Sequence, residues 1–250
     1  IGMAHFYSGN YQEAARVLEA VDKGSLEDDA TFWQAEARYR LGQYDSARAL
    51  YGRLIARHPD FPRLSEAYYG LGWAAFRLSD LTGARNAYAE AIRRMPDGRT
   101  KQDATYRLGL VLVDLKDWDN ARQTFEVLLK GSLDPAQAAD ARFQIAWSLY
   151  RQGRLEEAAS SFGAFAQAHA SNRLAPQALI WQGRSLFRLK RYADAINALQ
   201  TALGHGNATP GQQYEAREQL AAAYYNAGQF EESRRVYEVL MAMGDLPPER

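Results

Sequence analysis

One short pattern recurs along the chain, and its spacing constrains the fold more than any other feature. A turn-forming pair precedes a large apolar residue, here called the anchor, and a small residue stands three positions after it. The anchors are Tyr11, Tyr44, Leu81, Trp118, Leu155, Tyr192 and Phe230. Their steps of 33, 37, 37, 37, 37 and 38 residues indicate an array of repeated structural elements.

The residues that follow each anchor predict a helix with one apolar face. An apolar residue stands seven positions after every anchor, and a spacing of three and seven residues keeps side chains on the same helix face. The small residues three positions after the anchors are Ala14, Ala47, Ala84, Ala121, Ala158, Ala195 and Ser233. We expect them to lie where this helix, helix B, meets a preceding helix.

The preceding helix, helix A, is predicted from the stretch before each anchor. These stretches have helical apolar spacing, and a small residue stands ten positions before five of the anchors, where it would allow two helices to approach closely. These small residues are Ala35, Gly72, Gly109, Ala146 and Gly183. Each repeat is therefore predicted to be helix A, a tight turn and helix B.

The positions of the prolines support these boundaries. Proline inside a helix costs roughly 3 kcal/mol, and all eight prolines fall between the predicted helical hairpins. Asp134-Pro135 and Thr209-Pro210 have the order expected of an N-cap followed by proline in the first turn. Pro247 and Pro248 are expected to end the last helix.

The composition favours a protein partner over a nucleic acid. The 30 Lys and Arg residues balance the 30 Asp and Glu residues, so the chain lacks the basic excess typical of a nucleic-acid binder. No apolar run is long enough to predict a transmembrane segment. The chain begins at Ile1, in the middle of a predicted helix, and we expect the natural chain to continue on the N-terminal side.

The sequence predicts no catalytic, cofactor-binding or metal site, and hence no enzyme. Without cysteine the chain has no disulfide, thiolate metal site or cysteine nucleophile, and its four histidines are scattered without metal-ligand spacing. The glycine-rich stretch 204–207 lacks the lysine of a phosphate-binding loop. The pairs Glu156-Glu157 and Glu231-Glu232 fall in the first turn of a helix, where acidic side chains complement the helix dipole.

The pattern resembles the tetratricopeptide repeat, a helix-turn-helix motif of about 34 residues. Residues 67–72 together with Leu81, Ala84, Tyr88 and Pro96 match its small-aromatic-alanine-proline signature closely. The resemblance implies an all-α, right-handed solenoid of about seven repeats, forming a single array over residues 1–250 with an incomplete first repeat. It also implies a non-catalytic scaffold that binds a protein or peptide.

A narrower resemblance concerns the junctions between repeats. Residues 162–165 and 171–178 are similar to junctions in bacterial envelope repeat proteins, such as outer-membrane assembly lipoproteins and the Tol-Pal coordinator. This implies a bacterial protein of the periplasm or envelope, in preference to the cytoplasm, and a possible envelope complex.

The family resemblance also implies a ligand site, because helix A lines the concave groove of such arrays. The positions twelve, eight, five and four before the anchor would face this groove. The candidate residues are Phe32, Tyr39, Arg40, Tyr69, Trp73, Phe76, Arg77, Tyr106, Phe143, Trp147, Tyr150, Arg151, Arg184, Phe187 and Arg188.

Two interpretations of these residues are open. As a binding surface, an aromatic ladder flanked by arginines would suit a peptide with apolar anchors and acidic flanks. Alternatively, the aromatic residues pack between neighbouring helices and the arginines form a solvated face. Two other functions also remain open: a recruiting segment of a larger multidomain protein, and a glycan or polymer-export scaffold.

Overall fold

The structure, a computed structural model, describes residues 1–21, 24 and 26–243, and every regular element in these residues is an α-helix. The predicted end of the last helix at Pro247 and Pro248 lies outside the described residues. None of the described helices is long and apolar enough to cross a membrane.

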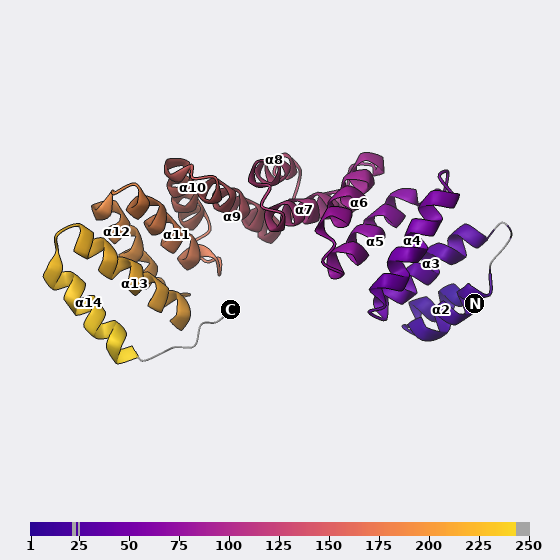
Figure 1. Ribbon diagram of the computed structural model, residues 1–250, viewed down its shortest axis with the longest axis horizontal. Coiled ribbons are helices and arrows are strands. Elements are labelled where there is room, and N and C mark those ends of the chain that lie inside the picture. Colours follow the sequence, from indigo (N-terminus) through magenta and orange to yellow (C-terminus); the bar gives the residue numbers. More distant parts are fainter. Residues whose placement is uncertain (22–23, 25, 244–250) are drawn as a thin grey trace. The chain divides into compact units, whose positions relative to one another are not determined.

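The helices divide between two compact units, residues 1–131 and 132–250 (Figure 1). The first unit contains α1 (Gly2–Tyr7), α2 (Tyr11–Glu19), α3 (Glu27–Arg40), α4 (Tyr44–Arg57), α5 (Leu64–Arg77), α6 (Leu81–Arg94), α7 (Arg99–Asp114) and α8 (Trp118–Leu128). The second unit contains α9 (Pro135–Arg151), α10 (Leu155–Ala168), α11 (Ala175–Arg188), α12 (Tyr192–Leu203), α13 (Pro210–Asn226) and α14 (Phe230–Met243).

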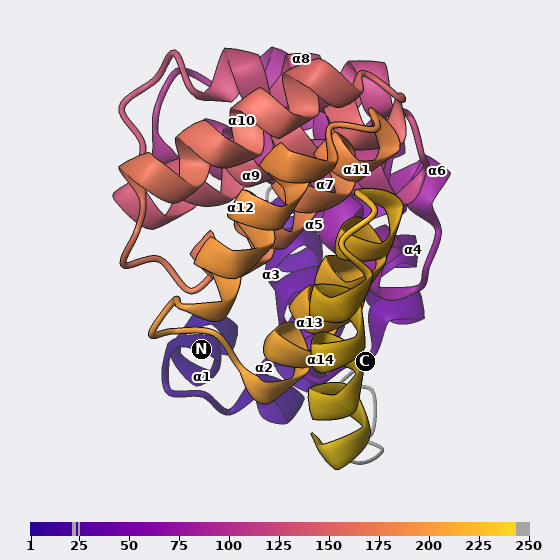
Figure 2. The ribbon, with the colours of Figure 1, turned by 90° about the vertical axis from the view of Figure 1, so that its left-hand side faces the viewer.

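Within each unit the helices alternate between helix A, with odd numbers, and helix B, with even numbers. Every helix B begins at an anchor, and within each unit each helix packs against the helices next to it in the chain. Figure 2, turned so that the second unit faces the viewer, shows its helices stacked in chain order. The predicted all-α repeat of helix, tight turn and helix is confirmed. The single array over the whole chain stays a prediction.

The small residues three positions after the anchors form the centre of each hairpin, as predicted. All six alanines are 0% exposed. Ser233, which takes this place in the last repeat, is 3% exposed, and its hydroxyl donates a hydrogen bond of 2.9 Å to the carbonyl oxygen of Ala221. The buried hydroxyl is therefore satisfied, which is why serine is tolerated at an alanine position.

The glycines ten positions before the anchors give room to the large side chains of helix B. A Cβ atom on Gly109 would lie 2.6 Å from the ring of Phe125, and one on Gly183 would lie 2.6 Å from Leu199. Both distances are shorter than any real contact of a Cβ atom. The close approach of the two helices in these hairpins therefore requires glycine.

The turn between helix A and helix B has the same backbone conformation in every repeat. The residue two positions before each anchor has a positive φ, and in three repeats it is not glycine: Ser79, Lys116 and Lys190. The Lys190 N–H donates to the Phe187 carbonyl and the Arg191 N–H to the Leu186 carbonyl, each at 2.9 Å. This pair of bonds is a Schellman motif, which ends helix A in a left-handed residue.

The predicted helix caps are also confirmed. The Asp134 carboxylate accepts hydrogen bonds from the backbone N–H groups of Ala136 and Gln137 at the start of α9. Thr209 and Gln212 form a capping box at the start of α13, in which each side chain bonds the other residue's backbone N–H. Both caps precede proline in the first turn, so the helix starts are locally encoded.

We expect Lys190→Gly to stabilise the protein. Replacing a left-handed residue with glycine removes a strain of roughly 1–2 kcal/mol from the folded state. Glycine also makes the unfolded chain more flexible, which offsets about 0.5–1 kcal/mol of that stabilisation. The free energy of unfolding in urea should therefore rise by about 0.5–1 kcal/mol. The matched control is Lys130→Gly, at a loop position without positive φ, which should not stabilise. Equal effects of the two changes would contradict the turn assignment.

A second prediction separates the hairpin core from the surface. Ala121→Trp places a large side chain at a fully buried position and should cost at least about 1–3 kcal/mol. Arg151→Ala changes an exposed side chain and should stay within about 0.5 kcal/mol of the parent. Thermal unfolding followed by circular dichroism should show a marked fall in midpoint for the first variant alone. Similar shifts in both would refute the assignment of core and surface.

Candidate functional site

The candidate residues all lie on A helices, from α3 to α11, but their side chains have two different environments. Phe32 is 1% exposed, and its ring packs against Tyr51 at 6.2 Å and Phe61 at 5.8 Å. A ligand would find almost no surface on this side chain. Phe32 therefore belongs to the hairpin core, and we do not retain it in the candidate site.

The other aromatic residues twelve positions before an anchor also pack against helix B. The ring centroids of Tyr106 and Phe125 are 6.0 Å apart, and those of Phe143 and Phe162 are 5.5 Å apart. Both Tyr106 and Phe143 are half-buried. The contacts of Tyr106 and Phe143 are therefore those expected of rings that pack between neighbouring helices.

Two of the aromatic residues five positions before an anchor contact the anchor itself. The Phe187 ring lies 5.5 Å from Tyr192, and the Tyr39 ring lies 5.3 Å from Tyr44. Phe76 lines a small cavity of about 20 Å³ beside Tyr88. Tyr39 and Phe187 therefore pack across the turns of their hairpins.

Three aromatic residues of the second unit meet in one cluster on α9 and α11. The centroid of the Trp181 ring lies 4.6 Å from that of Trp147 and 4.9 Å from that of Tyr150. The Trp147 and Tyr150 rings are nearly parallel, with an interplanar angle of 17° and a centroid distance of 5.8 Å. All three side chains are half-buried, so part of each ring is open to a ligand.

Three arginines lie over these rings. The Cζ atom of Arg151 is 5.4 Å from the Trp147 centroid, and that of Arg188 is 5.2 Å from the Tyr150 centroid. Arg184 is 4.5 Å from the Trp181 centroid and pairs with Glu215 of α13 at 2.8 Å. We call these six residues, Trp147, Tyr150, Trp181, Arg151, Arg184 and Arg188, the aromatic–arginine cluster.

The first unit contains a related arrangement around Trp73 of α5. The Cζ atom of Arg107, from α7, lies 3.6 Å from the Trp73 centroid, and the Tyr39 ring of α3 is 6.2 Å from the same indole. The Nε atom of Arg107 donates to the Asp103 carboxylate at 2.6 Å, and the Tyr69 hydroxyl donates to the same carboxylate. This network links α5 to α7 and holds the Trp73 side chain under a cation.

A cavity of about 370 Å³ lies beside Trp73, between α3 and α5. It is lined by Glu36, Tyr39, Arg40, Tyr51, Tyr69, Gly70 and Trp73. Arg40 is exposed at this cavity, whereas Arg77 lies over the Tyr44 ring, with its Cζ atom 4.7 Å from the centroid.

Two tyrosines at this cavity have raised pKa values. Burial, followed by the negative charge of Glu36 and a 2.5 Å hydrogen bond to its carboxylate, holds the pKa of Tyr51 well above its usual value. Burial, followed by the hydrogen bond to Asp103, raises the pKa of Tyr69. Both hydroxyls therefore act as hydrogen-bond donors at neutral pH.

The sequence analysis missed two residues that the structure places in these clusters, Trp181 and Arg107. Both stand eleven positions before an anchor, three residues before the position that contains Trp73 and Trp147. Side chains three apart share a helix face. Including the position eleven before the anchor in the predicted stripe would have found both.

The fold and these clusters define a helical-repeat protein whose A helices carry aromatic and basic side chains on an accessible face. The tetratricopeptide repeat pattern matches residues 1–60, 34–99, 143–212 and 182–245, and a second pattern of the same family matches residues 103–130. The chain belongs to the tetratricopeptide repeat family. Repeats of this family generally form protein-interaction scaffolds without catalytic residues.

Solved structures of the same fold cover nearly the whole chain. The C-terminal part of a tetratricopeptide-repeat protein from Cytophaga hutchinsonii aligns with a TM-score of 0.74 and 17% identity, over 97% of this chain and 94% of that one. YrrB, described as a TPR protein with an unusual peptide-binding site, aligns with a TM-score of 0.62 and 20% identity, over 80% and 96% of the two chains. No curated protein sequence matches the chain.

A third prediction follows from the Tyr51 hydroxyl. A pKa that is higher in the folded state than the ordinary value of about 10 gives stability that is complete below pH 10 and is lost as the pH rises further. The urea unfolding free energy of the parent should therefore fall more steeply between pH 9 and 11 than that of Tyr51→Phe, by up to about 1.4 kcal/mol per pH unit.

The control for this measurement is Tyr7→Phe, because Tyr7 is 70% exposed. Its pH dependence should match that of the parent. Parallel curves for the parent and Tyr51→Phe would contradict a donor role for the Tyr51 hydroxyl.

Proposed function

We propose that the chain is a non-catalytic scaffold that holds a protein or peptide segment on the exposed face of its A helices. The aromatic–arginine cluster of the second unit carries this proposal. Tryptophan, tyrosine and arginine dominate the binding energy of protein interfaces, and here six such side chains from two helices are in contact.

The mutual contacts of the cluster favour binding because they reduce the entropy cost. Each ring is held by a neighbouring ring or by an arginine, so little side-chain freedom remains to be lost when a ligand binds. The two tryptophans also contribute a large apolar area with a polar indole N–H at its edge. A ligand with an apolar side chain would remove this area from water.

The arginines favour acidic residues beside that apolar anchor. Arg188 is exposed, and no carboxylate among the described residues pairs with it. An arginine that already stacks on a ring still presents its N–H groups at the edge of the guanidinium, where a carboxylate can accept two hydrogen bonds. The ligand we propose is therefore a peptide with an apolar anchor and acidic flanks.

The aromatic–arginine cluster favours a peptide ligand over a glycan ligand. Sugars stack on open ring faces, whereas here Arg151 covers a face of Trp147 and Arg184 covers a face of Trp181. The peptide-binding site in the description of YrrB, a protein of the same fold, also favours the peptide. A recruiting segment of a larger protein would use this surface in the same way, and the envelope complex stays a prediction.

The test measures binding to an array of twelve-residue peptides, each with one Trp or Leu flanked by Glu, and to a matched array with Lys in place of Glu. We expect the parent to bind the acidic series selectively, with affinity that falls as salt increases. The variant Trp147→Ala, Trp181→Ala, Arg188→Ala should lose at least about tenfold in affinity, since hot-spot residues contribute about 2 kcal/mol each.

Arg235→Ala is the control, because Arg235 is an exposed arginine of α14 outside the cluster. It should bind as the parent does. Absence of binding to the acidic series, or equal binding by the parent and the triple variant, would refute the proposal. Binding to a glycan array that survives high salt and requires Trp147 would support the glycan scaffold instead.

A further inference from the structure

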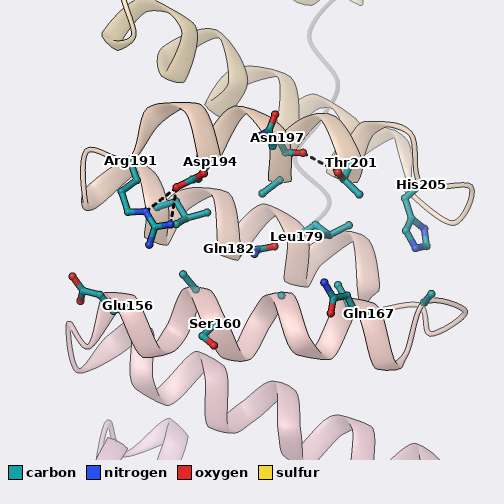
Figure 3. A pocket seen from close by; sticks show the side chains of 16 residues that line it. Glu156, Ser160, Gln167, Leu179, Gln182, Arg191, Asp194, Asn197, Thr201 and His205 are labelled. Carbon is teal, nitrogen blue, oxygen red and sulfur yellow. Dashed lines mark hydrogen bonds and ion pairs between the residues drawn. The ribbon is translucent and has the colours of Figure 1, made fainter.

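The second unit contains a groove of about 630 Å³ that the A-helix clusters do not explain (Figure 3). Its walls are two B helices, α10 and α12, and its floor is α11, which contributes Leu179, Gln182 and Leu186. None of its lining residues belongs to the aromatic–arginine cluster. It is therefore a surface separate from the proposed binding face.

The repeat with the anchor Leu155 lacks two side chains that three other repeats have at the equivalent positions. Four positions after the anchor, three earlier repeats have arginine, whereas this repeat has Ala159. Eleven positions after the anchor, the same three repeats have Ile or Leu, whereas this repeat has Ala166. The residues at these positions in the other three repeats are Arg48, Arg85 and Arg122, and Ile55, Ile92 and Leu129.

In the first unit, one of the three equivalent arginines links two successive B helices, whereas Arg85 and Arg122 bond to Asn86 and Glu126 of their own helices. Arg48 of α4 reaches the N-cap residue of α6, Asp80, with 3.6 Å between its Nη1 atom and the carboxylate. In the groove, the N-cap residue of α12 is Arg191, which pairs with Asp194 of its own helix at 2.7 Å. Ala159 has no charge to offer Arg191, so no such ion pair crosses from α10 to α12.

Three side-chain amides line the groove. Gln182 lies on the floor, with Gln167 on the α10 side and Asn197 on the α12 side (Figure 3). Their amide groups make no hydrogen bond to another described residue. Each amide has a donor and an acceptor side by side, which matches the N–H and C=O groups of a peptide backbone.

The length of the groove suits a short extended chain. The 14 residues of α10 rise about 21 Å. An extended segment that rises about 3.3 Å per residue would span this length with about six residues.

We propose that this groove binds an extended, uncharged peptide segment of about six residues with small side chains. The middle of the groove is lined by small and apolar residues and by uncharged polar groups, while Glu156, Arg191 and Asp194 lie at one end and His205 at the other (Figure 3). A charged side chain in the middle would lose water without gaining a partner. The site is independent of the A-helix face.

The test selects random seven-residue peptides displayed on phage against the parent protein. We expect enriched peptides rich in Gly, Ala, Ser, Thr and Asn, whose synthetic forms are then titrated. The variant Ala159→Arg, Arg191→Asp transfers the Arg48–Asp80 pair to this position and should close the groove. It should weaken binding of these peptides at least tenfold.

Gln182→Ala provides a second measurement, which removes the floor amide without filling the groove and should weaken binding about threefold to tenfold. The variant Trp147→Ala, Trp181→Ala is the matched control and should bind these peptides as the parent does. Its unchanged binding would separate this site from the proposed function. Failure to enrich peptides, enrichment of charged or aromatic peptides, or unchanged binding by Gln182→Ala would each overturn the proposal.

Discussion

The fit of one large side chain of helix B against one small residue of helix A is the contact on which the rest of the structure depends. Phe125 packs where Gly109 has no Cβ atom, and Leu199 packs in the same way against Gly183. The helices can then approach closely enough to bury the alanines between them completely. A single hairpin buries only one face, so each unit gains further stability by stacking its hairpins.

One face of helix A does not take part in this contact between helix A and helix B. In the second unit this face carries Trp147, Trp181 and Arg188, whose contacts run between neighbouring A helices. In the first unit Trp73 and Arg107 do the same, supported by Asp103. The same stacking that stabilises the unit therefore assembles an accessible aromatic and basic surface.

Repeats that share the same helix-turn-helix fold can have different surfaces, because the residue type differs at a few positions counted from the anchor. Arg48 ties α4 to α6, whereas Ala159 at the equivalent position leaves the space between α10 and α12 open. Arg48 is exposed, whereas Ala159 is a buried member of the core of the second unit. The same register position can therefore carry a surface side chain in one repeat and a core side chain in another.

The sequence by itself determined the repeat boundaries, the buried alanines and the caps at Asp134 and Thr209, because these depend on periodicity and on bonds within a few residues. It did not show that Phe32 is buried, that Trp181 and Arg107 join the clusters, or that α10 and α12 leave a groove between them. Those features depend on which side chains of neighbouring helices face each other. Only the tertiary structure decided them, because packing between helices sets the exposure of each side chain and the distance to its partner.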